Sequence, residues 1–251
     1  MATLYNRGEV LGRDDRQAAD WYRKAADQGH AASQVRLATM YAEGLGVPQD
    51  LQQAFHWFRE AAKQGNAEAQ LNVGIMQATG QGAPRDEAQA AGWYRKAADQ
   101  ALPTAQLNLG LLYAEGRGGL PRDDAQAVGW YRKAAEQGLS LAQLMMGLAY
   151  ASGRGLAKDD RQAFQWVEKA AANGSALAQY GLGMLYRNGR GIEQDWVQAH
   201  LWLNIAVSGG YHGATQQLDY ITSQMDESAL ARARQLAREW RAANARASSG
   251  N

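Results

Sequence analysis

RDDRQAADWYRKAADQG, residues 13–29, recurs almost unchanged at residues 85–101 and again at 122–138. Carboxylates, a lysine and aromatic rings together could form an active site, but three near-copies in one chain indicate a repeated structural unit. The tryptophan of this segment is one of six that stand 36 or 37 residues apart. A period of that length is typical of stacked helical repeats, so the sequence predicts an all-α solenoid. The six residues are Trp21, Trp57, Trp93, Trp130, Trp166 and Trp202.

The recurring segment is predicted to form the second helix of each repeat. An aspartate stands seven residues before each tryptophan, and a glutamine follows the aspartate by three residues. Aspartate at the N-cap with glutamine at N3 is a capping-box arrangement, so six copies indicate a helix start and not a carboxylate site. A glycine eight residues after the tryptophan predicts a left-handed helix end, and Ala101 should terminate its helix less well. The aspartates are Asp14, Asp50, Asp86, Asp123, Asp159 and Asp195, and the glycines are Gly29, Gly65, Gly138, Gly174 and Gly210.

The first helix of each repeat is predicted from segments such as AQLNLGLLYAEGRG at residues 105–118. Four of these helices carry a glycine in the middle, and Ala38 holds the equivalent place in another. A helix-interior glycine costs about 1 kcal/mol relative to alanine, so its repeated use predicts that another helix passes close by. A tyrosine follows three residues later, with Gln77 as the exception. The glycines are Gly74, Gly110, Gly147 and Gly183, and the tyrosines are Tyr41, Tyr113, Tyr150 and Tyr186.

The two ends of the chain depart from the repeat pattern. Tyr5 aligns with Tyr41, so the chain is expected to open inside a repeat. Near the other end, DESALARARQLAREWRAANAR predicts an amphipathic helix that caps the stack, with Ala237 and Trp240 facing inward. The predicted boundaries are 1–30 for a partial first repeat, 31–212 for repeats of about 36 residues, 213–246 for a degenerate repeat and C-terminal capping helix, and 247–251 for a disordered tail.

Composition excludes several classes of function. Hydrophobic residues make up 46% of the 251 residues, enough to bury a core. The 26 basic and 25 acidic residues leave no basic footprint, so we expect no nucleic-acid partner. Without cysteine the chain has neither a disulfide nor a thiolate zinc site. No apolar run approaches the roughly 18–20 residues of a membrane span.

The repeat pattern resembles that of the Sel1-like repeat family, bacterial relatives of the tetratricopeptide repeats. The family pattern, roughly A-Q-x-x-L-G-x-x-Y-x-x-G-x-G-V-x-x-D-x-x-x-A-x-x-W-Y-x-x-A-A-x-x-G, is matched nearly throughout by residues 69–101 and 105–138. The resemblance implies a right-handed α/α superhelical solenoid whose first helices line a concave groove. It also implies protein binding, often in bacterial envelopes, which favours periplasm or envelope over cytoplasm. Some members resemble immunity proteins that neutralise secreted phospholipase effectors.

Several residue clusters could suggest chemistry, but we expect no catalytic, cofactor or metal site. The Gly-x-Gly loops follow helices and so fit helix ends better than phosphate cradles. The four histidines share no metal-ligand spacing, and no nucleophile motif occurs. One tryptophan per repeat at a fixed place predicts core packing, and the Arg23–Lys24 pair is expected to face solvent. The loop arginines Arg117, Arg154 and Arg190 are likewise expected to be solvated surface charges.

The candidate partner-binding residues lie on the first helices. If positions five and nine of these helices both face the groove, they form one apolar stripe; alternatively, curvature buries position nine between repeats. Two asparagines share position six, where they could hold a peptide or simply bond a neighbouring turn. Position five is Val35, Leu71, Leu107, Leu144 and Tyr180; position nine is Thr39, Ile75, Leu111, Leu148 and Met184; the rim is Glu43, Thr79, Glu115, Ser152, Arg187 and Asn188; the asparagines are Asn72 and Asn108.

These patterns predict a binding protein and not an enzyme. The expected function is that of a scaffold or adaptor, which holds another protein or a peptide in the groove. A stiff, preorganised surface loses little entropy when a partner docks. The alternative is an immunity or inhibitor protein that occludes a secreted effector such as a phospholipase. The sequence leaves the oligomeric state open.

Overall fold

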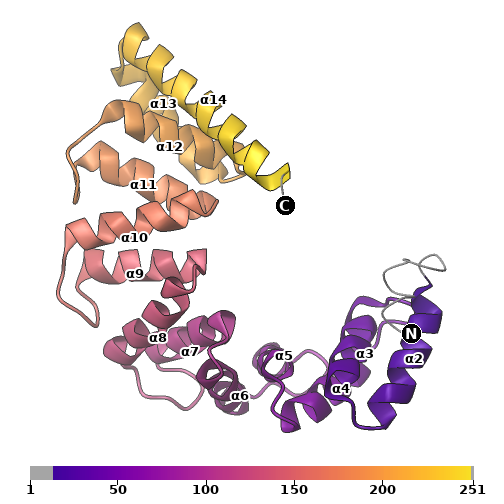
Figure 1. Cartoon of the computed structure of the whole chain (residues 1–251). Coiled ribbons are helices and arrows are strands. Elements are labelled where there is room, and N and C mark those ends of the chain that lie inside the picture. Colours follow the sequence, from indigo (N-terminus) through magenta and orange to yellow (C-terminus); the bar gives the residue numbers. More distant parts are fainter. Residues whose placement is uncertain (1–13, 250–251) are drawn as a thin grey trace. The chain divides into compact units, whose positions relative to one another are not determined.

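The computed structural model describes residues 14–249, with side chains through residue 244, and every regular element in that range is helical (Figure 1). The predicted all-α class is therefore confirmed, while the predicted start of the partial first repeat, including Tyr5, lies outside the described residues. The first helices are α3 (Ala31–Glu43), α5 (Ala67–Thr79), α7 (Pro103–Glu115), α9 (Ser140–Ser152) and α11 (Ala176–Asn188). The second helices are α2 (Asp15–Asp27), α4 (Leu51–Lys63), α6 (Glu87–Asp99), α8 (Asp124–Glu136), α10 (Asp160–Ala172) and α12 (Trp196–Ser208).

The helices group into two compact units, which divide between Trp130 and Tyr131 inside α8. The first unit holds α2 to α7 with the start of α8, and the second holds the remainder of α8 with the helices that follow. Within a unit, each first helix packs against the second helix of its own repeat and against the second helix before it. For example, α5 contacts both α6 and α4. The repeats of each unit therefore stack through alternating first and second helices.

The mid-helix glycines mark close helix–helix contacts, as the sequence predicted. A Cβ atom added to Gly74 would lie 2.6 Å from Cε1 of Tyr94, on the second helix of the same repeat. The equivalent atom on Gly147 would lie 2.5 Å from Val167, and that on Gly183 would lie 2.8 Å from Leu203. These separations are shorter than van der Waals contact, so only glycine lets the paired helices approach this closely.

The aspartate caps form as predicted, but the glutamines act differently from a capping box. The Asp86 carboxylate accepts from the backbone N–H of Gln89 at 2.9 Å. The Gln89 side chain donates to that same carboxylate at 2.8 Å. It does not reach the backbone N–H of Asp86, because this group already donates to the carbonyl of Gln77 at 2.8 Å. The equivalent backbone bond joins Asp50 to Tyr41 at 2.9 Å, so the five caps from Asp50 onward also tie a second helix to the first helix before it.

The helix exits adopt the left-handed conformation, including the one that lacks glycine. Gly65 has a φ of 90°, and Ala101 at the equivalent place has a φ of 62°. Ala101 is the one non-glycine residue with positive φ among residues 14–249. Its backbone N–H still bonds the Ala98 carbonyl at 2.9 Å, and the next N–H bonds the Ala97 carbonyl at 3.2 Å. The exit thus keeps its geometry, and alanine incurs the left-handed strain of about 1–2 kcal/mol.

The deepest core comes from position seven of the first helices and not from the tryptophans. The prediction that the tryptophans pack in the core holds only in part: Trp130 is buried, and Trp57 and Trp202 are half-buried against core clusters. Trp21 is 42% exposed. Lysines lie over the exposed ring faces, with Lys24 Nζ 4.6 Å from the centre of the Trp21 ring. The position-seven side chains are fully buried, since they face both neighbouring second helices; they are Leu37, Val73, Leu109, Met146 and Leu182.

The second unit ends in the short 3-10 helix η1 (His212–Ala214), α13 (Thr215–Gln224) and α14 (Glu227–Ser249). The predicted C-terminal helix is therefore present, and it packs on α12, where Trp240 meets Trp202 edge-on at 5.8 Å. Ala237 is fully buried in this contact. The helix continues through Ser249, past the predicted end at residue 246, because its last residues are rich in helix-forming alanine and arginine. The final two residues of the predicted tail lie outside the described residues.

Candidate protein-binding surface

Position five of the first helices is mostly covered. Val35, Leu107 and Leu144 are only 4–5% exposed, and Leu71 and Tyr180 are half-buried. Leu144 packs in a cluster with residues of α10 and α11, and Leu71 packs against a cluster built from α6 and α7. The expected stripe of two exposed apolar rows is therefore wrong, because position five fills the contacts between repeats.

Position nine is the row that reaches solvent. Leu148 is 52% exposed, and Thr39, Ile75, Leu111 and Met184 are half-buried. The alternative in which curvature buries position nine is therefore also wrong. Position thirteen lies one turn further along the same helix face and is exposed at every copy. We call the exposed and half-buried residues of these two rows the first-helix surface: Thr39, Glu43, Ile75, Thr79, Leu111 and Glu115 in the first unit, and Leu148, Ser152, Met184 and Asn188 in the second.

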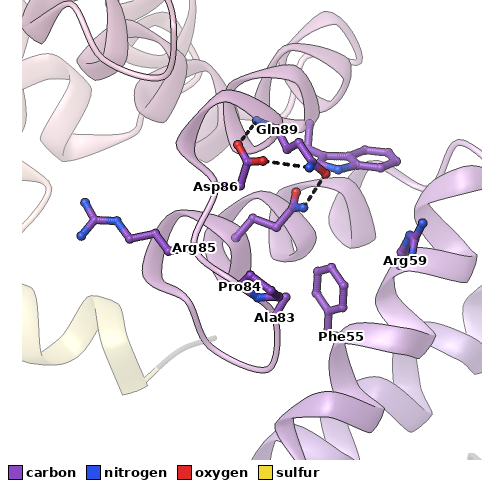
Figure 2. A pocket seen from close by; sticks show the side chains of 9 residues that line it. Phe55, Arg59, Ala83, Pro84, Arg85, Asp86 and Gln89 are labelled. Atoms are coloured by element: carbon purple, nitrogen blue, oxygen red, sulfur yellow. Dashed lines mark hydrogen bonds between the residues drawn. The ribbon is translucent and has the colours of Figure 1, made fainter.

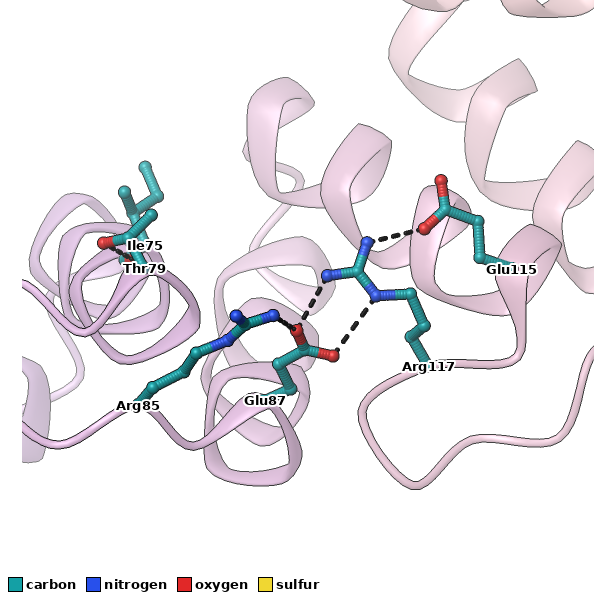
Figure 3. Close-up of polar contacts among 6 residues, drawn as sticks. All are labelled: Ile75, Thr79, Arg85, Glu87, Glu115 and Arg117. Carbon is teal, nitrogen blue, oxygen red and sulfur yellow. Dashed lines mark hydrogen bonds and ion pairs between the residues drawn. The ribbon is translucent and has the colours of Figure 1, made fainter.

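Hydroxyl groups on this surface are held by the helices that carry them. Thr79 Oγ1 donates to the Ile75 carbonyl at 2.9 Å (Figure 3). Ser152 Oγ makes the same bond to the Leu148 carbonyl at 2.7 Å. Thr39 Oγ1 donates to the carbonyl four residues before it at 3.0 Å. The side chains are therefore fixed in place, and each presents mainly its carbon atoms and acceptor lone pairs to solvent.

The remaining candidate residues have structural contacts. Asn72 Nδ2 donates to the Glu68 carbonyl of its own helix at 3.0 Å, which favours the structural interpretation over a peptide clamp. Asn108 is half-buried at the equivalent place. Arg187 donates to Gln217 Oε1 at 2.7 Å and lies 4.8 Å from the centre of the Tyr220 ring. Arg187 therefore anchors α13 and is not a free rim residue.

A ladder of buried glutamines connects successive repeats, and sequence analysis gave it no role. Position four of every first helix is glutamine, and all five are 3–5% exposed. Gln70 Nε2 donates to the Ala62 carbonyl at 3.2 Å, and its Oε1 accepts from Gln100 at 2.8 Å. Gln143 repeats this pattern with the Ala135 carbonyl and Asn173. The available signal is the recurrence of this glutamine in every copy, after alanine in four of them and after Ser33 in the other. The five residues are Gln34, Gln70, Gln106, Gln143 and Gln179.

The loop arginines pair with acids of the preceding repeat. Arg117 donates to both oxygens of Glu87, at 2.7 and 3.2 Å, and to Glu115 at 2.7 Å (Figure 3). Arg85 also pairs with Glu87. The hydrogen bond from Arg117, followed by that from Arg85, lowers the pKa of the Glu87 carboxyl to about 2. Arg190 pairs with Asp160 in the same way at 2.8 Å. Arg117 and Arg190 are therefore stacking contacts between repeats, and the expectation of free surface charges is wrong for them.

Arginines of the second helices also bind tyrosines of the first helices. Arg23 donates to the Tyr41 hydroxyl at 2.9 Å, and Arg95 donates to the Tyr113 hydroxyl. The expectation that the Arg23–Lys24 pair simply faces solvent is therefore wrong for Arg23. The sequence spacing of 18 residues is the same in both pairs, so this contact is a recurring part of the repeat.

A cleft of about 420 Å3 lies where α4, α5 and the start of α6 meet. Phe55 and Arg59 line it (Figure 2), as do Gln77 and Trp93. Gln77 is only 7% exposed, and its Nε2 donates to Gln89 Oε1 at 2.8 Å. Its own Oε1 is buried without a hydrogen-bond partner. Gln77 is the exception in the tyrosine row, and that exception is the signal in the sequence for this cleft.

The described part of the chain has no cluster of side chains that could hold a metal ion. Among residues 14–244, no group of three or more His, Asp or Glu side chains has suitable geometry. His200 is 2% exposed, and burial, with a smaller effect of Arg234, lowers its pKa, so the ring is neutral at neutral pH. None of the described helices combines the length and apolar character that a membrane span requires.

Comparison with protein-family models matches the chain to one family along most of its length. The model described as Sel1 repeat matches six consecutive segments. Together they run without a gap from residue 1 to residue 211, well over half of the chain. The matched segments are residues 1–30, 31–66, 67–102, 103–139, 140–175 and 176–211.

Solved structures show the same likeness. A Sel1 repeat protein from Oxalobacter formigenes is 31% identical, the match covers 94% of each chain, and the TM-score is 0.81. The protective antigen c5321 of uropathogenic Escherichia coli is also 31% identical, with a TM-score of 0.63; the match covers 95% of this chain and 59% of that one. Immunity protein PA5088 from Pseudomonas aeruginosa shares the fold at 20% identity, 84% and 82% coverage and a TM-score of 0.50. Among curated proteins no match was found.

Proposed function

This chain belongs to the Sel1 repeat family, and from that membership we propose that it is a non-enzymatic scaffold or adaptor that binds a segment of another protein along its first-helix surface. Proteins of this family are generally protein-interaction scaffolds. The single observation that supports the chosen surface is the exposure of Leu148. It is 52% exposed on a regular helix, while Leu144 one turn before it is 4% exposed.

Leu148 is favourable for binding because its surroundings are already ordered. Its carbonyl is held by Ser152, and its helix is tied to α8 and α10 through Gln143, which contacts Ala135 and Asn173. A partner that covers Leu148 would therefore gain apolar burial without ordering the backbone beneath it. Met184 is the half-buried equivalent on the next first helix and would extend the same contact within the second unit.

The first unit would offer the same position-nine row, but with different residues at position thirteen. Ile75 and Leu111 are its half-buried apolar members, and Glu43 and Glu115 are exposed at position thirteen. The second unit has Ser152 and Asn188 at that position. We propose that these position-thirteen residues set specificity, because they vary from copy to copy while the framework beneath them repeats.

A photo-crosslinking experiment tests the proposed surface in the native cell. A photoreactive phenylalanine analogue replaces Leu148, and in a matched control it replaces Ile192, which is 38% exposed on a loop. We expect a defined protein adduct from position 148 that is absent from position 192. The adduct should also disappear when Met184 is changed to Glu beside it. Equal adducts from both positions, or none from position 148, would contradict the proposed surface.

The inhibitor alternative predicts a different outcome of the same experiment. The likeness to the immunity protein concerns the fold alone, at 20% identity. An inhibitor should yield one folded enzyme as the adduct and should abolish that enzyme's activity when the two are mixed at equal concentration. An adaptor should instead yield a partner whose activity survives binding, and an isolated peptide of that partner should compete for the surface.

A further inference from the structure

The cleft beside Gln77 lies in a repeat that has lost two large side chains at once. Position eleven of the first helices is tyrosine in four helices and Gln77 in α5. The caps from Asp50 onward share a second feature. The residue three positions before each of these aspartates is large and apolar, except at Ala83. Both shortened residues line the same cleft of about 420 Å3. The large residues equivalent to Ala83 are Val47, Leu120, Leu156 and Ile192.

The other repeats show what a tyrosine ring contacts at this place. Tyr41 accepts a hydrogen bond from Arg23, which is position nine of α2. Tyr186 packs edge-on against Phe164, which is position five of α10, with ring centres 5.3 Å apart and an interplanar angle of 89°. One position therefore supplies a donor to the hydroxyl, and the other supplies an aromatic wall for the ring.

The repeat that lacks the tyrosine carries both kinds of contact residue, whereas each repeat above shows only one of them. Arg59 is position nine of α4 and Phe55 is position five, and both line the cleft (Figure 2). The Arg59 guanidinium makes no hydrogen bond or ion pair with the described part of the chain. Gln77 contributes an Oε1 atom that is buried and has no partner. An unpaired buried acceptor is unfavourable, so the site is incomplete without a ligand that donates a hydrogen bond.

This cleft is lined differently from the equivalent region beside α11. There a more open depression of about 550 Å3 is lined by Tyr186 and Ile192 among others, and Phe164 is not among its lining residues. Phe164 is only 7% exposed, because the Tyr186 ring packs against it. Phe55 is half-buried and open to the cleft instead. The aromatic wall is therefore accessible in the repeat of α5.

We infer that this cleft binds the side chain of a tyrosine from a partner protein, with the ring against Phe55 and Trp93 and the hydroxyl between Arg59 and Gln77. The phenol hydroxyl accepts from Arg59, and it donates to Gln77 Oε1 once the amide, whose oxygen is covered in the empty cleft, turns toward the ring. A phenylalanine ring fits the same space but leaves both groups unpaired. The cleft is built from α4, α6 and position eleven of α5, so it is separate from the first-helix surface and does not depend on it.

Titration of the full chain with single amino-acid analogues tests this inference. N-acetyl-tyrosinamide is added while the NMR signals of the Gln77 and Gln89 side-chain amides and the Trp93 indole N–H are followed. We expect these signals to shift with a dissociation constant on the order of millimolar, as befits one small side chain. N-acetyl-phenylalaninamide should bind at least roughly tenfold more weakly, because it leaves the Gln77 and Arg59 groups unpaired.

Three variants and one further ligand make the test decisive. Gln77→Tyr restores the side chain of the other repeats, so it should fold, fill the cleft and abolish binding. Ala83→Leu should also abolish binding, while Leu148→Glu on the first-helix surface should leave it unchanged. Equal affinity for the two amides, or retained binding in Gln77→Tyr, would overturn the inference. Tighter binding of p-cresol than of N-acetyl-tyrosinamide would also overturn it, because the cleft would then select free phenols over a tyrosine of a polypeptide.

Discussion

Gln100 donates its side-chain amide to Oε1 of Gln70, 30 residues earlier in the chain, at 2.8 Å. The same amide also donates to the Gly65 carbonyl at 2.9 Å, and Gln70 donates in turn to the Ala62 carbonyl at 3.2 Å. One buried glutamine thus joins the end of α4, the start of α5 and the end of α6. Equivalent contacts recur in both units, so this chain of amides is a main polar connection between neighbouring repeats.

Removing the buried glutamine should destabilise the fold. We expect Gln70→Leu to lower the free energy of unfolding by about 2–3 kcal/mol, because the buried Ala62 carbonyl loses its side-chain donor and the Gln100 amide loses one of its two acceptors. Urea unfolding followed by circular dichroism measures the change. Gln52→Leu is the matched control: Gln52 is exposed on α4, and its replacement should change stability by no more than about 0.5 kcal/mol. Equal effects of the two substitutions would show that the ladder contributes nothing.

The strained exit at Ala101 predicts a stabilising substitution. Ala101→Gly should raise the free energy of unfolding by about 1 kcal/mol, since glycine adopts the φ of 62° without a Cβ clash. The reciprocal change, Gly65→Ala, should lower stability by a similar amount. A Cβ on Gly65 meets no atom within 4 Å, so its whole cost is backbone strain. Thermal unfolding of both variants checks the pair; a destabilised Ala101→Gly would contradict the interpretation of the exit.

The close contact at Gly74 predicts opposite results for two helix glycines. Gly74→Ala should destabilise by about 1–3 kcal/mol, because its Cβ would lie 2.6 Å from Tyr94 and the overpacking outweighs the gain in helix propensity. Gly92→Ala should stabilise by about 0.5–1 kcal/mol, because a Cβ there meets no atom within 4 Å. Denaturant unfolding of the two variants gives the signs. The same sign for both would mean that helix propensity, and not helix contact, decides the effect at Gly74.

The pairing of Glu87 with Arg117 and Arg85 predicts an acid-sensitive contribution to stability. These arginines hold the folded-state pKa at about 2, below the ordinary value of 4.5, so the contribution is present above about pH 4.5 and is lost as the pH falls toward 2. Glu87→Gln should therefore be less stable than the original chain at pH 7. The difference in the free energy of unfolding should shrink as the pH falls from about 4.5 toward 2.

An NMR titration of the Glu87 carboxyl checks the cause directly. Its midpoint should lie near pH 2 in the original chain and return toward the ordinary value in Arg117→Ala, because the first and largest hydrogen-bond contribution is removed. Arg122→Ala provides a control, since Arg122 pairs with Asp124 and not with Glu87. High salt should move the midpoint upward in the original chain, because exposed ion pairs are screened.

Helix ends were predictable because their signals lie within about one turn. Asp86 caps α6 and Gly80 ends α5 in the left-handed conformation, as local rules require. The role of Gln89 was not predictable in the same way. Its side chain binds the Asp86 carboxylate because the Asp86 backbone N–H already donates to a carbonyl of the preceding helix. A rule based on the three-residue spacing of Asp and Gln takes no account of a carbonyl from another helix.

The sequence by itself determined the repeat period, the pairing of helices and nearly all of their ends, because caps, glycines and periodicity act locally. Only the tertiary structure decided which rows of side chains are covered: Leu144 is 4% exposed and Leu148, one turn away, is 52% exposed. The physical reason is that a helical period shows which residues share a face, while burial depends on where neighbouring helices pack. The cleft follows the same logic, since Gln77 meets Phe55 and Arg59 of another helix there.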